Sequence, residues 1–177
     1  MDKAALALII PLLQYPEGRG EIFRQTAQEA ASLTDSEVSK NLLAFLQACE
    51  AFQTDELAAN YVSTFDFNEQ TSLYLTALLF GDERKRIDVL TALKNIYLKS
   101  GLALDETELP DYLPALLEFC CAAEESKAKE ALQLVQGAIE LLYQRLAEAK
   151  SFYKELFAAL VIALEQTDTT LPVGGVL

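Results

Sequence analysis

The sequence predicts an all-α protein with a single compact multi-helix domain. Its 177 residues are 51% hydrophobic, which suits one substantial core and is too apolar for a disordered chain. Apolar residues return at three- and four-residue steps as far as about residue 166, and no segment alternates convincingly as a strand does. We therefore expect a helical domain over residues 1–166 and a flexible tail over residues 167–177, which lack periodicity.

The first helix is expected in the apolar run from Ala4 to Leu13. This run is too short to span a bilayer. Asp2 beside Lys3 is a poor match to the positively charged N-terminal region of a secretion signal, and no small-residue cleavage site follows. A secretion signal is therefore not expected. Pro16 and Gly18 are suited to ending the helix, because proline disfavours helical backbone before it and glycine accepts the left-handed conformation. We interpret the run as a buried N-terminal helix.

Capping residues mark the helices that follow. Thr34–Glu37 has the spacing of a capping box, and Thr54 with the aspartate after it is suited to capping the next segment. Asn68 is expected to cap a helix over Glu69–Phe80, with Gly81 in the left-handed position beyond its end. The middle of the chain therefore reads as consecutive helices with short connections.

The second half of the chain continues in the same way. A helix is predicted to start at Asp82, to run to Lys99 and to end at Gly101. Pro110 is suited to the first turn of the next helix, where its missing amide hydrogen leaves no bond unmade. Ser126 is expected to cap a last long helical region, which is broken near residue 150.

The charge balance narrows the class of partner. The chain carries 27 Asp and Glu against 14 Lys and Arg, a formal net charge of −13. Such a field repels nucleic-acid phosphates and anionic lipid surfaces. We therefore expect neither nucleic-acid binding nor direct membrane insertion, and we expect neutral or basic partners.

Several kinds of catalytic and metal site are excluded by composition. The sequence has no histidine, which removes Ser-His-Asp catalysis, histidine-ligated zinc and imidazole proton transfer. Cys49, Cys120 and Cys121 show neither the spacing of a metal or redox pair nor the even count of a disulfide framework. We expect them to be buried small apolar side chains in a reducing compartment.

An acidic window stands out between Ser100 and Ser126, because it contains no Lys or Arg. Its negative field favours a cationic ligand or peptide, although acidic residues in a first helical turn also complement the helix dipole and need no partner. The window contains seven acidic residues, which are Asp105, Glu106, Glu108, Asp111, Glu118, Glu124 and Glu125.

Four short sequence motifs, taken in order, resemble one known family. They are Tyr61–Asp66, Thr71–Leu75, Phe80–Arg84 and Glu108–Pro114, with supporting matches at Leu12–Pro16, Leu117–Phe119 and Arg145 followed by Ser151–Tyr153. Together they are similar to the nitrate reductase molybdenum cofactor assembly chaperones of the NarJ family, which belongs to the redox-enzyme maturation group with TorD and DmsD. The similarity extends from about Leu12 to Leu164.

This resemblance implies an all-helical, cytoplasmic chaperone and no enzymatic activity. It implies that the partner is the catalytic (alpha) subunit of respiratory nitrate reductase, bound through its N-terminal peptide. It further implies that the chaperone assists insertion of the molybdenum cofactor and delays membrane docking until assembly is complete, while carrying no cofactor or metal of its own.

The matched motifs also imply candidate residues for contact with the client peptide. An arginine-bearing peptide with an apolar face would suit an acidic groove between helices. The candidates are Tyr61, Phe65, Asp66, Leu73, Tyr74, Glu108, Asp111, Tyr112 and Glu118. For each there is a structural alternative: aromatic residues at helical spacing are often core, and aspartate often caps a turn. In the wider group a histidine often stands where Tyr112 stands here, so no histidine-linked proton chemistry is carried over.

Two other functions remain open from the residues alone. Glu108 and Asp111, three residues apart, could be the acid and base of an enzyme or ligands of a hard cation. Alternatively, the chain could be a helical adaptor that buries an apolar face in a stable hetero-oligomer. Nothing else in the sequence favours an enzyme that uses this carboxylate pair. Such pairs are also common on solvated helices.

Overall fold

The structure is a computed structural model that describes residues 1–16, 18, 20–33, 36–102 and 108–165. Its elements, in order, are α1 (Lys3–Ile9), the 3₁₀ turn η1 (Ile10–Leu13), α2 (Gly20–Ala30), α3 (Ser36–Cys49), α4 (Thr54–Tyr61), the π-helical turn η2 (Val62–Asp66), α5 (Leu75–Leu79), α6 (Glu83–Lys99), α7 (Leu113–Ala122), α8 (Glu125–Glu148) and α9 (Tyr153–Glu165). The described residues form no strand, and the predicted all-α class is confirmed.

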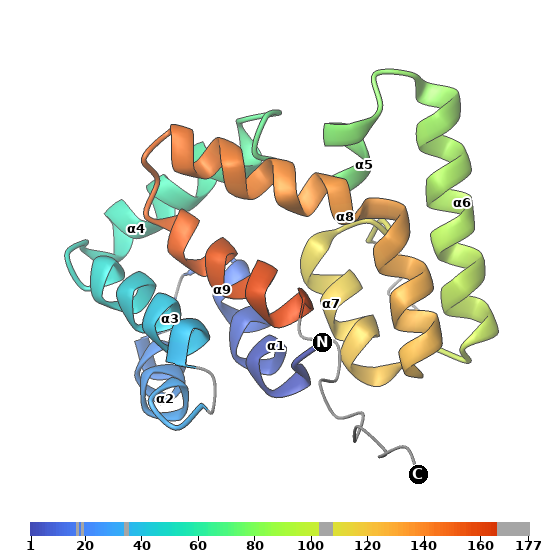
Figure 1. Cartoon of the computed structure of the whole chain (residues 1–177). Coiled ribbons are helices and arrows are strands. Elements are labelled where there is room, and N and C mark those ends of the chain that lie inside the picture. The colour runs from blue at the N-terminus through green and yellow to red at the C-terminus, as the bar shows by residue number, and fades with distance from the viewer. Residues whose placement is uncertain (17, 19, 34–35, 103–107, 166–177) are drawn as a thin grey trace, which may run out of the picture.

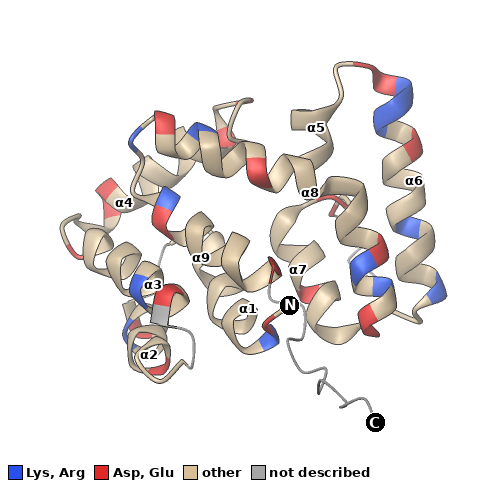
Figure 2. Ribbon diagram, in the orientation of Figure 1, with Lys and Arg blue, Asp and Glu red and all other residues tan. Residues whose placement is uncertain are grey.

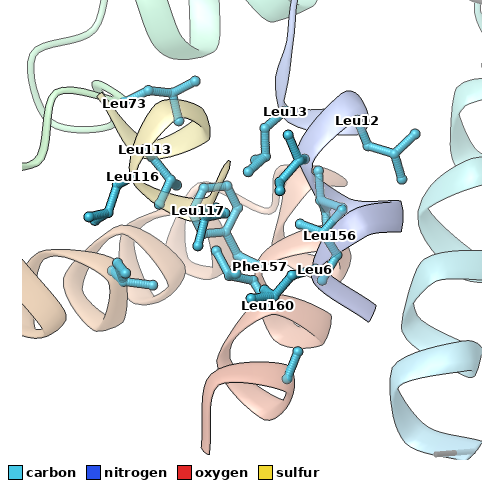
Figure 3. Close-up of a cluster of buried hydrophobic side chains, with 14 of the residues drawn as sticks. Leu6, Leu12, Leu13, Leu73, Leu113, Leu116, Leu117, Leu156, Phe157 and Leu160 are labelled. Atoms are coloured by element: carbon cyan, nitrogen blue, oxygen red, sulfur yellow. The ribbon is translucent and has the colours of Figure 1, made fainter. Parts of the chain in front are cut away.

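Helix α9 lies at the centre of the arrangement and packs against α1, α3 and α8 (Figure 1). Its side chains are apolar on most faces, so it is stable only when other helices surround it. Helix α7 has the same character and packs against α1, η1 and α8. Figure 3 shows the centre of the core, where Leu6, Leu117, Phe157 and Leu160 are fully buried.

The predicted limits of one helix and the predicted break in the last helical region are confirmed. Asp82 caps α6 by accepting a hydrogen bond from the amide of Arg84, and α6 ends at Lys99. Gly101 follows with a φ of +70°, the left-handed conformation expected of it. The break near residue 150 separates α8 from α9, and Lys150 itself has a φ of +53°.

The predicted helix over Glu69–Phe80 is wrong. Only α5 is helical there, and residues 67–73 form a loop. Asn68 accepts from the amide of Gln70 within this loop, as a turn residue rather than a helix cap. The guanidinium of Arg145 donates to the carbonyl oxygen of Gln70 over 2.8 Å, so tertiary contacts offer this backbone an alternative to the helix. Gly81 is not among the described residues with a left-handed φ, because the extended residue Phe80 ends α5 instead.

Some predicted caps are displaced by a few residues. Gln53, not Thr54, forms a capping box with Glu56 at the start of α4. Pro114 lies in the first turn of α7, whereas Pro110 lies in the turn before it. The last long helix begins two residues earlier than expected, with Glu124 at the N-cap position but without a side-chain capping bond. The proposed box at residues 34–37 begins outside the described residues.

The N-terminal run forms α1 and η1 and is largely buried, as predicted. Cys49 and Cys120 are also buried, whereas Cys121 is half-buried, and all three thiols are free. No helix in the described part of the chain is long and apolar enough to cross a membrane. The predicted flexible tail over residues 167–177 and the domain end at residue 166 lie outside the described residues.

Candidate functional site

The candidate residues meet where the segment before α5 lies beside the segment before α7. Tyr74 and Tyr112 form an isolated antiparallel bridge, and the amide of Leu113 donates to the carbonyl oxygen of Leu73 over 2.9 Å. These contacts join two of the sequence motifs that are far apart in the chain. Leu73 is buried and its side chain belongs to the core (Figure 3).

A tyrosine pair and a carboxylate form the half-buried centre of the site. The hydroxyl of Tyr74 donates to a carboxylate oxygen of Glu108 over 2.8 Å. The rings of Tyr74 and Tyr112 lie 5.2 Å apart between centroids and are tilted by 34°. Burial, followed by the hydrogen bond with Glu108, raises the pKa of Tyr74 to about 12. The tyrosine therefore stays protonated and remains a donor at neutral pH.

Tyr61 connects this pair with the N-terminal part of the chain. Its ring is buried, and its hydroxyl donates to the carbonyl oxygen of Leu13 over 3.0 Å. Burial, followed by the influence of Tyr112, raises the pKa of Tyr61. The ring of Tyr15 meets that of Tyr61 edge-on at 5.7 Å, and Tyr15 is 42% exposed. Phe65 is buried behind Tyr61, with ring centroids 5.1 Å apart.

Asp111 is fully buried rather than presented to solvent. One carboxylate oxygen, Oδ2, accepts from both the amide and the hydroxyl of Thr76, over 2.9 and 2.6 Å. The Nε of Arg86, in the basic cluster at the start of α6 (Figure 2), donates to the same Thr76 hydroxyl over 3.2 Å. Nearby, the hydroxyl of Tyr97 donates to the carbonyl oxygen of Pro110 over 2.7 Å. Asp111 therefore attaches the segment before α7 to the start of α5.

Two acidic candidates are exposed. Asp66 ends η2 and directly follows Phe65, whose ring lies beside that of Tyr61. Glu118 lies on α7, and no hydrogen bond or ion pair with a described residue joins it to the other candidates. The structure therefore brings eight of the nine candidates into one neighbourhood and leaves Glu118 apart.

The accessible part of this neighbourhood is a surface of phenol rings and carboxylates. We call it the tyrosine–carboxylate surface, and it consists of Tyr15, Asp66, Tyr74, Glu108 and Tyr112. Phenol rings attract cations and carboxylates accept hydrogen bonds from guanidinium groups, so this surface is suited to an arginine side chain.

Three residues that shape the site were not predicted. Tyr15 lies within the Leu12–Pro16 motif, so the resemblance already carried a signal for it. Thr76 and Arg86 carry no such local signal. Their roles depend on a buried carboxylate that comes from a distant part of the chain.

Comparison with known proteins decides the family. Residues 29–159, more than half of the chain, match the family described as nitrate reductase delta subunit. The chain belongs to this family. It is 36% identical over 168 residues to the probable nitrate reductase molybdenum cofactor assembly chaperone NarJ of Bacillus subtilis (strain 168), covering 93% of this chain and 90% of that protein. It is 31% identical over 159 residues to the NarJ of Escherichia coli (strain K12), covering 88% of this chain and 67% of that protein.

The predicted resemblance to the NarJ-type chaperones is thereby confirmed, and these relatives are named as assembly chaperones and not as enzymes. A further relative, the probable chaperone NarW of Escherichia coli (strain K12), is 37% identical over 103 residues, covering 58% of this chain and 45% of that protein. The two carboxylates of the alternative enzyme hypothesis also bind different partners, since Glu108 accepts from Tyr74 and Asp111 from Thr76. Among the described residues no group of three acidic or cysteine side chains could hold a metal ion.

Proposed function

We propose that this chain is a system-specific chaperone that binds the N-terminal segment of the respiratory nitrate reductase catalytic subunit. It holds that subunit ready for insertion of the molybdenum cofactor and delays its docking on the membrane until assembly is complete. The family and the names of the relatives support the general chaperone role. The three free thiols agree with action in a reducing compartment, which we take to be the cytoplasm.

The tyrosine–carboxylate surface is the observation that supports peptide binding most directly. A guanidinium group can lie over a phenol ring and still donate to a neighbouring carboxylate. Tyr74 and Tyr112 supply half-exposed rings, and Glu108 and Asp66 supply negative charge beside them. The net charge of −13 adds a long-range attraction for a basic peptide.

The buried candidates have a supporting role in this proposal. Tyr61, Phe65, Leu73 and Asp111 are at most 4% exposed, so a peptide on the surface of this conformation cannot reach much of them. They hold the accessible tyrosines in place through core packing and buried hydrogen bonds. Their direct contact with the client stays a prediction that requires the segments before α5 and α7 to separate. Glu118 stays a prediction for a second contact along α7.

Calorimetric titration with a synthetic peptide tests the proposal. The peptide copies the N-terminus of the nitrate reductase catalytic subunit from the same organism, and a scrambled peptide is the control. We expect saturable binding of the native peptide alone. Replacing Asp66 with Asn and Glu108 with Gln together should weaken binding at least tenfold, because both charges lie on the proposed surface.

The matched control is Glu83→Gln together with Asp88→Asn, which removes two exposed carboxylates from α6 and should leave the affinity within twofold. Equal weakening by the control would mean that net charge alone attracts the peptide, and the surface assignment would be wrong. Absence of binding by the unmodified protein would reject the peptide route. The helical-adaptor alternative predicts an obligate complex, so isolation of a folded free chain by size-exclusion chromatography would argue against it.

A further inference from the structure

Helix α6 is basic, on a chain that is otherwise strongly acidic. It carries five Lys and Arg residues and two acidic residues, a net charge of +3, whereas the whole chain has a net charge of −13. Figure 2 shows these basic residues spread along a helix at the edge of the molecule. Four of the five are exposed, and they are Arg84, Lys85, Lys94 and Lys99. Helix α6 therefore presents a basic surface to solvent.

These four exposed side chains form no ion pair with a described residue. Five basic residues on other helices do pair with a glutamate of their own helix, and they are Arg24, Lys40, Lys127, Lys129 and Lys154. The exposed charges of α6 are thus not used in pairs on the surface of the helix, and they are available to an anionic partner.

Apolar side chains share this face with the charges. Ile87 is 54% exposed and Leu98 is 62% exposed. Leu98 follows Ile87 by 11 residues, which is about three helical turns, so the two side chains lie on the same side of α6. The exposed residues Thr91 and Lys94 lie between them along that side. Helix α6 packs on the rest of the molecule through α5 and α8, and this side faces outward (Figure 1).

The partner that suits this face is a protein surface with both acidic and apolar side chains. Opposite charges attract across an interface, and burial of the apolar side chains adds to the binding. Nucleic acids and anionic lipids fit less well, because the rest of the chain repels phosphate groups. A basic peptide is also repelled by α6, so the segment proposed to bind the tyrosine–carboxylate surface does not bind here.

Helix α6 is linked directly to the candidate site. Nε of Arg86 donates to the hydroxyl of Thr76, and that hydroxyl donates to Asp111, the residue before Tyr112. A client whose N-terminal segment is held at Tyr112 therefore has the part that follows this segment close to α6. A weak contact becomes effective under these conditions, because the bound segment raises the local concentration of the rest of the client.

We propose that the outer face of α6 binds an acidic, partly apolar surface on the body of the same catalytic subunit whose N-terminal segment lies on the tyrosine–carboxylate surface. This outer face consists of Arg84, Ile87, Lys94, Leu98 and Lys99. The inference rests on the proposed function and adds a second point of contact to it. The chain then binds the whole subunit more tightly than it binds the isolated N-terminal peptide.

Charge reversal on α6 tests the inference in the full-length chain. The two ligands are the synthetic N-terminal peptide and the full-length catalytic subunit purified without its cofactor, and their affinities are measured by surface plasmon resonance. We expect Arg84→Glu with Lys94→Glu to weaken binding of the subunit at least tenfold and to leave binding of the peptide within twofold. The matched control is Lys40→Glu with Lys150→Glu, which makes the same change in net charge away from α6 and should leave both affinities within twofold.

A second variant tests the apolar part of the face. Ile87→Ser with Leu98→Ser should weaken binding of the subunit at least fivefold without weakening binding of the peptide. Leu43→Ser is the control, because Leu43 is also an exposed apolar residue but lies on α3. It should bind both ligands as the unmodified chain does.

The two ligands separate failure of this inference from failure of the proposed function. If both α6 variants bind the subunit as tightly as the unmodified chain does, the inference is wrong, and binding of the peptide still supports the proposed function. If the subunit binds and the peptide does not, the peptide route is rejected, and weaker binding by the α6 variants still supports the contact. If neither ligand binds, both proposals fail.

Carbodiimide coupling tests the same contact without altering the protein, in case a variant does not fold. The reagent joins a lysine amine to a carboxylate in direct contact with it, and the linked peptides are mapped by mass spectrometry. We expect links from Lys94 or Lys99 to Asp or Glu residues of the subunit. Links confined to lysines outside α6 would overturn the inference.

Vesicles of phosphatidylglycerol and a short DNA duplex test the choice of a protein partner. We expect neither to bind the unmodified chain. Binding of either one that is lost in Arg84→Glu with Lys94→Glu would show that α6 recognises phosphate groups, and the assignment to a protein surface would be wrong.

Discussion

The bond between Asp111 and Thr76 should be a main support of the candidate site, and removing it should destabilise the protein strongly. Oδ2 of Asp111 accepts two hydrogen bonds, from the amide and the hydroxyl of Thr76, and both residues are 0% exposed. Hydrogen bonds to a charged group contribute about 1.5–3 kcal/mol each, so Asp111→Ala should lower the free energy of unfolding by at least about 3 kcal/mol. For a chain of this size, that loss lowers Tm by at least about 6 °C.

Asp111→Asn separates hydrogen bonding from charge. The amide oxygen can still accept from both groups of Thr76, but an NH₂ group then occupies the position of Oδ1. That oxygen is buried and has no hydrogen-bond partner among the described residues, so the new donor is unsatisfied. An unsatisfied buried donor costs about 1–3 kcal/mol, and the Asn variant should therefore be more stable than the Ala variant.

The assay is urea unfolding followed by circular dichroism, with Asp66→Ala as the control. Asp66 is exposed, so its replacement should change the free energy of unfolding by no more than about 0.5 kcal/mol. If Asp111→Ala is as stable as this control, the buried carboxylate does not hold α5 and the reasoning is refuted. A folded, stable Ala variant that no longer binds the peptide would instead favour direct contact between Asp111 and the client.

Three further predictions concern the fold. Burial raises the pKa of Cys49 and of Cys120 to about 12 in the folded protein. The same thiols ionise at lower pH in the unfolded chain, so the free energy of unfolding should fall as the pH rises from about 9 towards 12. Urea titrations across this range should show the decline, and replacing both cysteines with Ala should flatten the decline between pH 9 and 10. An unchanged slope in the double Ala variant would contradict the prediction. Gly101→Ala should destabilise the chain by about 1–2 kcal/mol, because φ is +70°, and a neutral result in thermal unfolding would contradict the left-handed assignment. Phe157→Ala should cost about 3–5 kcal/mol, since the ring is fully buried, whereas Phe67→Ala, at 85% exposure, should be nearly neutral; equal losses would contradict the burial argument.

Local signals were sufficient to predict several helix limits. A cap acts on amides within its own first turn, so Asp82 identified the start of α6 without knowledge of the rest of the fold. The break near Lys150 was predicted as well. The prediction of a helix over Glu69–Phe80 failed because the apolar pattern of this segment suits a helix, whereas its backbone forms hydrogen bonds with distant groups such as the Arg145 guanidinium.

For the candidate site, residue types and their order established the all-helical class, the acidic character and the family resemblance, because these depend only on composition and local pattern. They also identified most of the residues that meet around Tyr74 and Tyr112. Only the tertiary structure decided which side chains face solvent. Asp111 is buried by Thr76, 35 residues away, and Tyr61 by contacts that include Leu13, 48 residues away. Exposure depends on such long-range packing, which the periodicity of a single segment does not contain.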